Sequence, residues 1–82
     1  MPIPQELVSE ITSGKYHETC LALCDSSLND NDVEDLVKAL RHNKKITQLV
    51  LTGNSIGNDG AKCLATLAHL TALDLTDNRI GP

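Results

Sequence analysis

Three side chains near the start of the chain, His17, Cys20 and Cys24, are of the types that bind zinc, and they follow the spacing H-x2-C-x3-C. Tetrahedral zinc needs its sulfur ligands about 2.3 Å from a common ion. The two cysteines lie in a run expected to form a strand, where residues four apart have Cα atoms about 13 Å from each other. The spacing therefore favours free thiols, and we predict neither a metal nor a cofactor.

A second set, Asp25, Ser26 and His17, contains the groups of a nucleophile, its base and an orienting acid. Nothing in the sequence fixes a base beside an activated hydroxyl, so we expect no nucleophilic catalysis. The glycines within residues 53–60 could line a phosphate site, but no Lys-Ser or Lys-Thr follows them. Tight turns explain these glycines better, and we predict that the chain is not an enzyme.

Length and composition restrict the class of partner. The 82 residues suit one domain with a thin core, and 7 Lys and Arg against 11 Asp and Glu give a net charge of −4. This balance argues against nucleic acid and against an acidic membrane surface. There is no run of about 20 apolar residues and no secretory signal. With the odd cysteine count of 3, this predicts a reducing, cytoplasmic location.

An internal repeat organises the chain. Residues 46–57 read ITQLVLTGNSIG and residues 70–81 read LTALDLTDNRIG, so apolar, Asn and Gly positions recur at an offset of 24. A weaker copy lies 28 residues upstream at Leu21, Leu23 and Leu28. We place its four extra residues at Arg41–Lys45, between a helix and the next strand. Glu18 and Ser26 depart from the pattern at its first apolar position and its Asn position.

Each copy predicts a strand, an Asn-containing bend and a helix. Helices are expected at 31–42 and 59–68, and the acidic run 29–35 suits a helix N-terminus better than a calcium loop. The side chains expected to face inward on these helices are Val33, Leu36, Val37 and Leu40, then Ala61, Leu64, Ala65 and Leu67. A further amphipathic helix, 4–12, is expected to cover the open end of the first repeat, with Gly14 as its stop.

The motifs Ile46-x-x-Leu49-x-Leu51-x-x-Asn54-x-Ile56 and Leu70-x-x-Leu73-x-Leu75-x-x-Asn78-x-Ile80 resemble the leucine-rich-repeat signature. The continuation Gly57-x-x-Gly60-Ala61-x-x-Leu64-Ala65 is similar to the ribonuclease-inhibitor-like subclass and to the GALA-type repeats of bacterial proteins delivered into host cells. The resemblance implies an α/β fold: a short leucine-rich-repeat solenoid with a parallel concave sheet, convex helices and an N-terminal capping helix. It also implies a protein-binding scaffold without chemistry of its own.

The predicted organisation is a single domain, 1–82, with an N-terminal helical cap at 1–17 and repeats at 18–45, 46–69 and 70–82, the last one incomplete. An alternative is that the chain is a capping or truncated fragment of a longer leucine-rich-repeat protein, with no partner except its missing repeats. In either case Leu67, Leu73, Leu75 and Ile80 are expected near an uncapped edge. An open edge of this kind predicts a weak homodimer through the C-terminal strand.

Residues between the inward leucines are expected to face the concave surface in columns. These columns are Cys20, Gln48 and Ala72; Ala22, Val50 and Asp74; and Cys24, Thr52 and Thr76, with Asp25, Gly53 and Asp77 at the rim. The predicted protein-binding residues are Gln48, Val50, Thr52, Asp74, Thr76 and Asp77. The resemblance extends this prediction to a bacterial effector that binds a host protein. The contact is expected to be small and to lie opposite a basic patch on the partner. The alternative is that the concave face is solvated and unspecialised.

Overall fold

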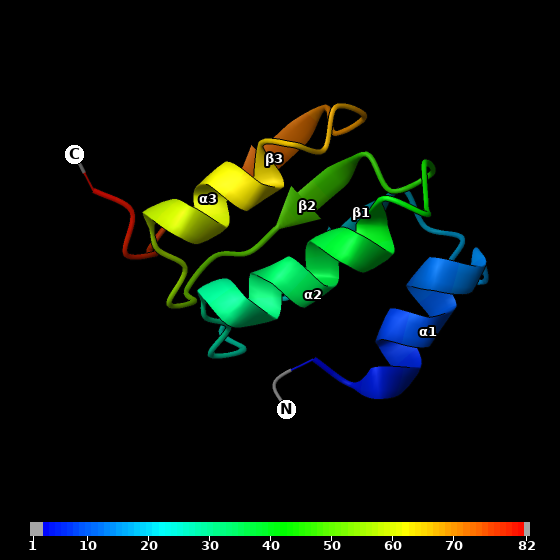
Figure 1. Ribbon diagram of the computed structural model, residues 1–82, viewed down its shortest axis with the longest axis horizontal. Coiled ribbons are helices and arrows are strands. Elements are labelled where there is room, and N and C mark those ends of the chain that lie inside the picture. The colour runs from blue at the N-terminus through cyan, green and yellow to red at the C-terminus, as the bar shows by residue number, and fades with distance from the viewer. Residues whose placement is uncertain (1–2, 82) are drawn as a thin grey trace.

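The computed structural model describes residues 3–81 (Figure 1). Its elements follow in the order α1 (Gln5–Ser13), β1 (Cys20–Ala22), α2 (Asp30–Leu40), β2 (Gln48–Val50), α3 (Asn58–Leu64) and β3 (Ala72–Asp74). The strands form one parallel sheet in the order β1-β2-β3. The helices lie side by side along one face of this sheet, with α1 against α2 and α2 against α3 (Figure 1). The predicted short α/β solenoid is confirmed.

The strand register follows from the alternation of leucines with smaller residues. Leu21 pairs with Leu49, and Leu49 with Leu73, so the leucines share the face that the helices cover. Leu21 is 2% exposed and Leu49 is fully buried, whereas Leu73 in the last strand is 39% exposed. The core is therefore well enclosed at β1 and β2 and open beside β3.

Helix α2 begins where the sequence supplies a capping box. Asn29 accepts a hydrogen bond from the backbone N–H of Asp32, and the Asp32 carboxylate accepts one from the N–H of Asn29, both at 3.0 Å. The helix starts at Asp30, one residue before the predicted start. Its four predicted inward residues, Val33, Leu36, Val37 and Leu40, are all buried.

Helix α3 is shorter than the sequence pattern predicted. It ends at Leu64 after 7 residues, against 11 in α2, whereas the connections to the next strands, 41–47 and 65–71, are equally long. The four-residue difference between the repeats therefore lies in helix length, and its placement at Arg41–Lys45 was wrong. Because the helix stops at Leu64, Ala65 caps its end and is exposed instead of facing inward. Leu64 and Leu67 are buried as expected.

Helix α1 covers the side of α2 that faces away from α3. Ile3 and Ile11 are fully buried in the common core, and Leu7 and Val8 pack against it. Gly14 ends the helix with a φ of 82°, a left-handed conformation that glycine adopts without steric cost. The buried amide of Asn43 then donates to the carbonyls of Ile11 and Tyr16, both at 3.3 Å, and so ties the helix end to the loop after α2.

Candidate binding surface

Two asparagines hold the bends that follow the strands. The side-chain oxygen of buried Asn54 accepts from the backbone N–H groups of Ser26 and Leu28 in the preceding repeat, both at 3.0 Å. Its amide donates to the carbonyls of Leu23 and Leu51, both at 2.9 Å. These bonds satisfy backbone groups that have left the sheet. The structural role predicted for Asn54 is thus confirmed.

Asn78 repeats this arrangement one strand further along. Its oxygen accepts from the N–H of Ile56 at 3.0 Å, and its amide donates to the carbonyls of Leu51 at 2.8 Å and Leu75 at 3.0 Å. In the first repeat Ser26 stands at this position and only reaches the carbonyl of Cys24, at 3.1 Å. The departure at Ser26 therefore leaves the first bend without the two-sided bridge that an asparagine provides.

The rim of the concave surface is formed by residues in the left-handed conformation. Asp25, Gly53 and Asp77 have φ values of 52°, 75° and 57°. Aspartate tolerates this conformation better than most residues, which explains why the column alternates between Asp and Gly. A Cβ atom at Gly53 would overlap the carboxylate of Asp25, so a side chain there would require that carboxylate to move.

A second set of contacts between repeats, at the start of the convex helices, was missed by the sequence analysis. The Asp30 carboxylate accepts from the N–H of Gly57 at 2.6 Å, and Asn58 accepts in the same way from Gly81 at 3.0 Å. A Cβ atom at Gly60 would lie 2.6 Å from the Asp30 carboxylate, so that glycine is needed for the close approach. The sequence repeat could have revealed these contacts, because the acceptors Asp30 and Asn58 are 28 residues apart and the donors Gly57 and Gly81 are 24 residues apart.

The six predicted binding residues lie on the sheet face opposite the helices and on its rim. Gln48 pairs with Ala72 and Val50 with Asp74, and beyond the strands the Gly53 N–H donates to the Thr76 carbonyl at 3.0 Å. Gln48, Asp74, Thr76 and Asp77 are exposed, while Val50 and Thr52 are half-buried. The strand columns are therefore as predicted. The binding role of these residues stays a prediction.

The charged group within the strands of this surface is Asp74, and it is held in place by its neighbours. Thr76 donates to the Asp74 carboxylate through its hydroxyl at 2.5 Å and through its backbone N–H at 3.0 Å. These bonds, with a smaller contribution from the Thr52 hydroxyl, lower the pKa of Asp74 below its ordinary value. The exposed carboxylate is therefore fixed and charged at neutral pH, on a surface whose rim adds Asp25 and Asp77.

The candidate chemical groups do not come together. Cys20 is half-buried, Cys24 is exposed, and both are free thiols. Within residues 3–81, no three His, Cys, Asp or Glu side chains are placed to share a metal ion. The Ser26 hydroxyl points to the Cys24 carbonyl in the bend, and the exposed His17 is not its hydrogen-bond partner.

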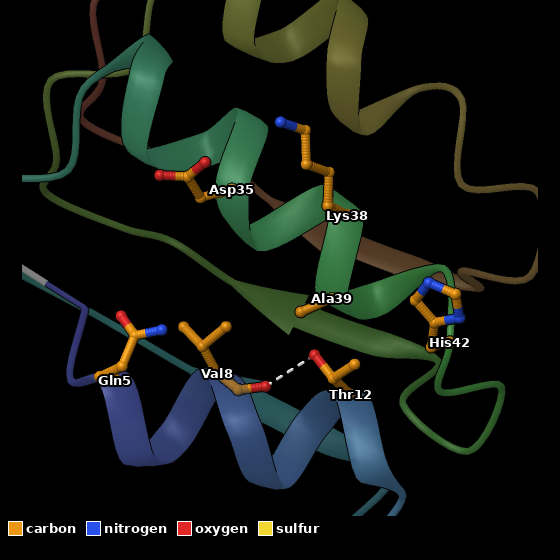
Figure 2. Close-up of a pocket in the computed structure, with 7 residues that line it drawn as sticks. All are labelled: Gln5, Val8, Thr12, Asp35, Lys38, Ala39 and His42. Carbon is orange, nitrogen blue, oxygen red and sulfur yellow. Dashed lines mark hydrogen bonds between the residues drawn. The ribbon is translucent and has the colours of Figure 1, made fainter.

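A shallow hollow of about 390 Å³ lies on the opposite, helical side, between α1 and α2 (Figure 2). Figure 2 shows Val8 and Ala39 at its floor with Gln5, Asp35, Lys38 and His42 around it, and the Thr12 hydroxyl turned back onto the Val8 carbonyl at 2.8 Å. The polar groups around this hollow do not converge on one point, so it has the character of a groove between packed helices. None of the described helices is long and apolar enough to cross a bilayer.

Comparison with known proteins agrees with the geometry. No solved structure gives a significant match to the chain. The family model described as Leucine Rich repeat matches residues 42–65 and 66–82, which together make up half of the chain. These segments contain β2 with Asn54 and β3 with Asn78, the strands and bends in which the repeat geometry is most regular. The chain belongs to the leucine-rich-repeat family.

Proposed function

We propose that this chain is a protein-binding module that contacts its partner through Gln48, Val50, Thr52, Asp74, Thr76 and Asp77. Leucine-rich repeats generally mediate protein–protein interaction, and the supporting observation here is the continuous, in-register surface that these residues form across β2 and β3. The Asn54 and Asn78 bridges hold the bends below it, so its side chains start from a rigid backbone.

The chemistry of the surface suggests the kind of partner. Asp74 and Asp77 give its last strand negative charge, whereas Val50 and Thr52 are small, half-buried and uncharged. We expect a partner that places a basic side chain against Asp74 and a small apolar group against Val50. A surface of three short strands falls below the roughly 800 Å² per partner of a standard interface, so the contact is expected to be weak.

The test is a comparison of two charge-matched double variants. Val50→Arg with Asp74→Arg places a large positive side chain on each half of the proposed surface. Ser9→Arg with Glu34→Arg makes the same change in net charge at exposed positions of α1 and α2. Proteins cross-linked to the wild type and to the helical control, but lost with the concave variant, would support the proposal. Identical sets for all three proteins, each with wild-type thermal melting, would overturn it.

We further propose that the chain belongs to the ribonuclease-inhibitor-like or GALA-type subclass and acts as a bacterial effector on a host protein. The support is the string Gly60-Ala61-x-x-Leu64-Ala65, in which Gly60 lets the Asp30 carboxylate approach α3. Three free thiols suit a reducing cytoplasm as its place of action. A secretion assay in a bacterium that exports such proteins, scored by arrival of the tagged chain in host cytoplasm, tests this. Retention of the chain in the bacterium contradicts it.

A further inference from the structure

The outer edge of β3 offers a regular row of backbone groups. In the row that faces β2, Leu51 and Gly53 donate to the carbonyls of Asp74 and Thr76, at 2.9 and 3.0 Å. The Thr71 N–H also belongs to the row facing β2, because it donates to the Thr47 carbonyl at 2.7 Å. Since backbone groups alternate along a strand, the groups of Leu73 point the other way, as do the Thr71 carbonyl and the Leu75 N–H. No strand among residues 3–81 pairs with that edge. Its available groups include the Thr71 carbonyl, both groups of Leu73 and the N–H of Leu75.

Apolar side chains lie beside the same edge. Leu64, Leu67, Leu70 and Leu73 border a hollow of about 270 Å³ that reaches along β3. Leu73 is 39% exposed and Ile80 is 41% exposed, the largest exposures among the big hydrophobic side chains of the described residues. An occupant of this edge would thus gain strand hydrogen bonds and apolar burial together.

The opposite end of the sheet, beside β1, is partly covered by the chain itself, because α1 packs against α2 there. The phenol of Tyr16 donates to the Cys20 carbonyl at 2.9 Å, and the Ser26 hydroxyl donates to the Cys24 carbonyl at 3.1 Å. Ser26 also lacks the amide oxygen with which Asn54 and Asn78 accept N–H groups from the repeat before them. A second copy that added its β1 to this β3 would therefore lack the two-sided asparagine bridge of a regular repeat, which disfavours head-to-tail growth.

We propose that a second copy of the chain joins β3 to β3, antiparallel about a two-fold axis, with Leu73 opposite Leu73. In this register the N–H of each Leu73 donates to the carbonyl of Leu73 in the other copy. Each Leu75 N–H donates to the Thr71 carbonyl of the other copy. The axis leaves the helices of both copies on one side of a continuous sheet, so the two Leu73 side chains come together beside the apolar hollows.

Charge and hydrogen bonding favour the register with Leu73 opposite Leu73 over the register that pairs Leu73 with Leu75. With Leu73 opposite itself, Asp74 faces the small Ala72 of the second copy. A shift that pairs Leu73 with Leu75 would place the two Asp74 carboxylates opposite each other, which is destabilising because both are charged. The shift would also need the Leu75 carbonyl, which already accepts the Asn78 amide at 3.0 Å.

The first test is sedimentation of the 82-residue chain over a concentration series. We expect a monomer–dimer equilibrium that Ala72→Lys tightens about 2- to 30-fold through two symmetric pairs with Asp74, and that Ala72→Glu loosens by a similar factor. Ala22→Lys, exposed in the same sheet but on β1, serves as the control and leaves the dimer unchanged. A strict monomer up to the solubility limit, or growth beyond a dimer, would overturn the proposal.

The second test reads the register directly and does not depend on affinity. In a background with Cys20→Ser, Cys24→Ser and Cys63→Ala, single variants Ala72→Cys and Asp74→Cys are oxidised alone and as a mixture. The proposed pairing brings these two positions to about 4.5 Å between Cα atoms, within disulfide range. A linked dimer of Ala72→Cys with Asp74→Cys as the main product of the mixture supports the register, while a self-linked Ala72→Cys dimer, which keeps Asp74, or no cross-link contradicts it.

Discussion

The two ends of this small solenoid differ in how completely they cover the apolar core. At the N-terminal end, α1 buries Ile3 and Ile11 completely, and the Tyr16 hydroxyl closes a carbonyl on the edge of β1. At the C-terminal end, β3 ends the sheet of the described residues with Leu73 and Ile80 about two-fifths exposed. The parallel strand register is the same at both ends, so the difference in exposure comes from what lies beside the sheet.

This difference shows that a repeat is a building unit with two unlike faces. The face toward the preceding repeat is satisfied internally, because Asn54 and Asn78 both reach backward to backbone groups there. The face toward the following position carries the donors and leucines that another strand would use. Stability should therefore fall from the capped end toward β3, and substitutions along the chain can measure that fall.

The largest loss of stability is expected in β2, the central strand, which pairs with both other strands. Leu49→Asp places a charge without a partner among fully buried aliphatic side chains, at a cost of several kcal/mol against a total stability of about 5 to 15 kcal/mol. We expect the chain to unfold. Circular dichroism that retains wild-type helix content and melting would show that position 49 does not face the core.

Two matched substitutions to alanine then compare the packing at the two ends. Ile11→Ala, at a fully buried site in α1, should destabilise the chain by about 2 to 5 kcal/mol. Leu73→Ala should lower the unfolding free energy by only about 1 kcal/mol, because this side chain keeps much of its exposure in the folded state. Urea unfolding at a low, fixed concentration measures both values. Equal losses would mean that the two ends are equally well packed.

The asparagine bridges provide the same comparison for polar groups. Asn54→Ala orphans backbone groups in a buried bend and should cost about 1 to 3 kcal/mol. Asn78 is half-buried, and water can replace some of its bonds, so Asn78→Ala should cost less. Thermal melting ranks the two variants. A larger loss for Asn78 would reverse the proposed decrease in stability from the Asn54 bend to the Asn78 bend.

Removing the Tyr16 hydroxyl tests its contact with the edge of β1. Tyr16→Phe should cost about 0.5 to 1.5 kcal/mol through loss of the bond to the Cys20 carbonyl. Burial, and then the nearby Glu18 carboxylate, raise the pKa of Tyr16 above 10.0. Because the folded pKa exceeds the unfolded one, this stabilisation is complete below pH 10.0 and is lost as pH rises through the folded value. Tyrosinate absorbance of the single Tyr measures that pKa, and an ordinary value would contradict the burial of the phenol beside Glu18.

The smallest effect is expected at Asp74, on the exposed strand. Thr76→Ala removes the hydroxyl bond, so the pKa of Asp74 should rise toward its ordinary value of 3.8. Since the folded pKa of Asp74 is lowered, its contribution to stability is present above the unfolded value and is lost as pH falls through the folded one. Carboxyl NMR titration of Asp74 follows the change. An unshifted titration would show that Thr76 does not hold the carboxylate.

Features with a fixed sequence period were predictable, and features that depend on the path of the chain were not. The columns of Gln48 with Ala72 and Val50 with Asp74 follow from the offset of 24 and the alternation of strands. The early end of α3 at Leu64 did not follow, because apolar residues continue past it to Leu67 and periodicity alone does not register a helix stop. The Tyr16 contact depends on how residues 14–19 return to the sheet, which no repeat encodes.

The contact between Gly53 and Asp25 makes the choice of rim residue depend on the neighbouring repeat. Replacing Gly53 by the Asp found at the equivalent positions 25 and 77 would match a consensus, yet the new Cβ atom would overlap the Asp25 carboxylate. The two sites are thus coupled, because an aspartate at 53 requires the Asp25 carboxylate to turn away. Designers who stack one Asp-bearing repeat on another would meet that coupling at each junction, so rim residues have to be chosen in adjacent pairs.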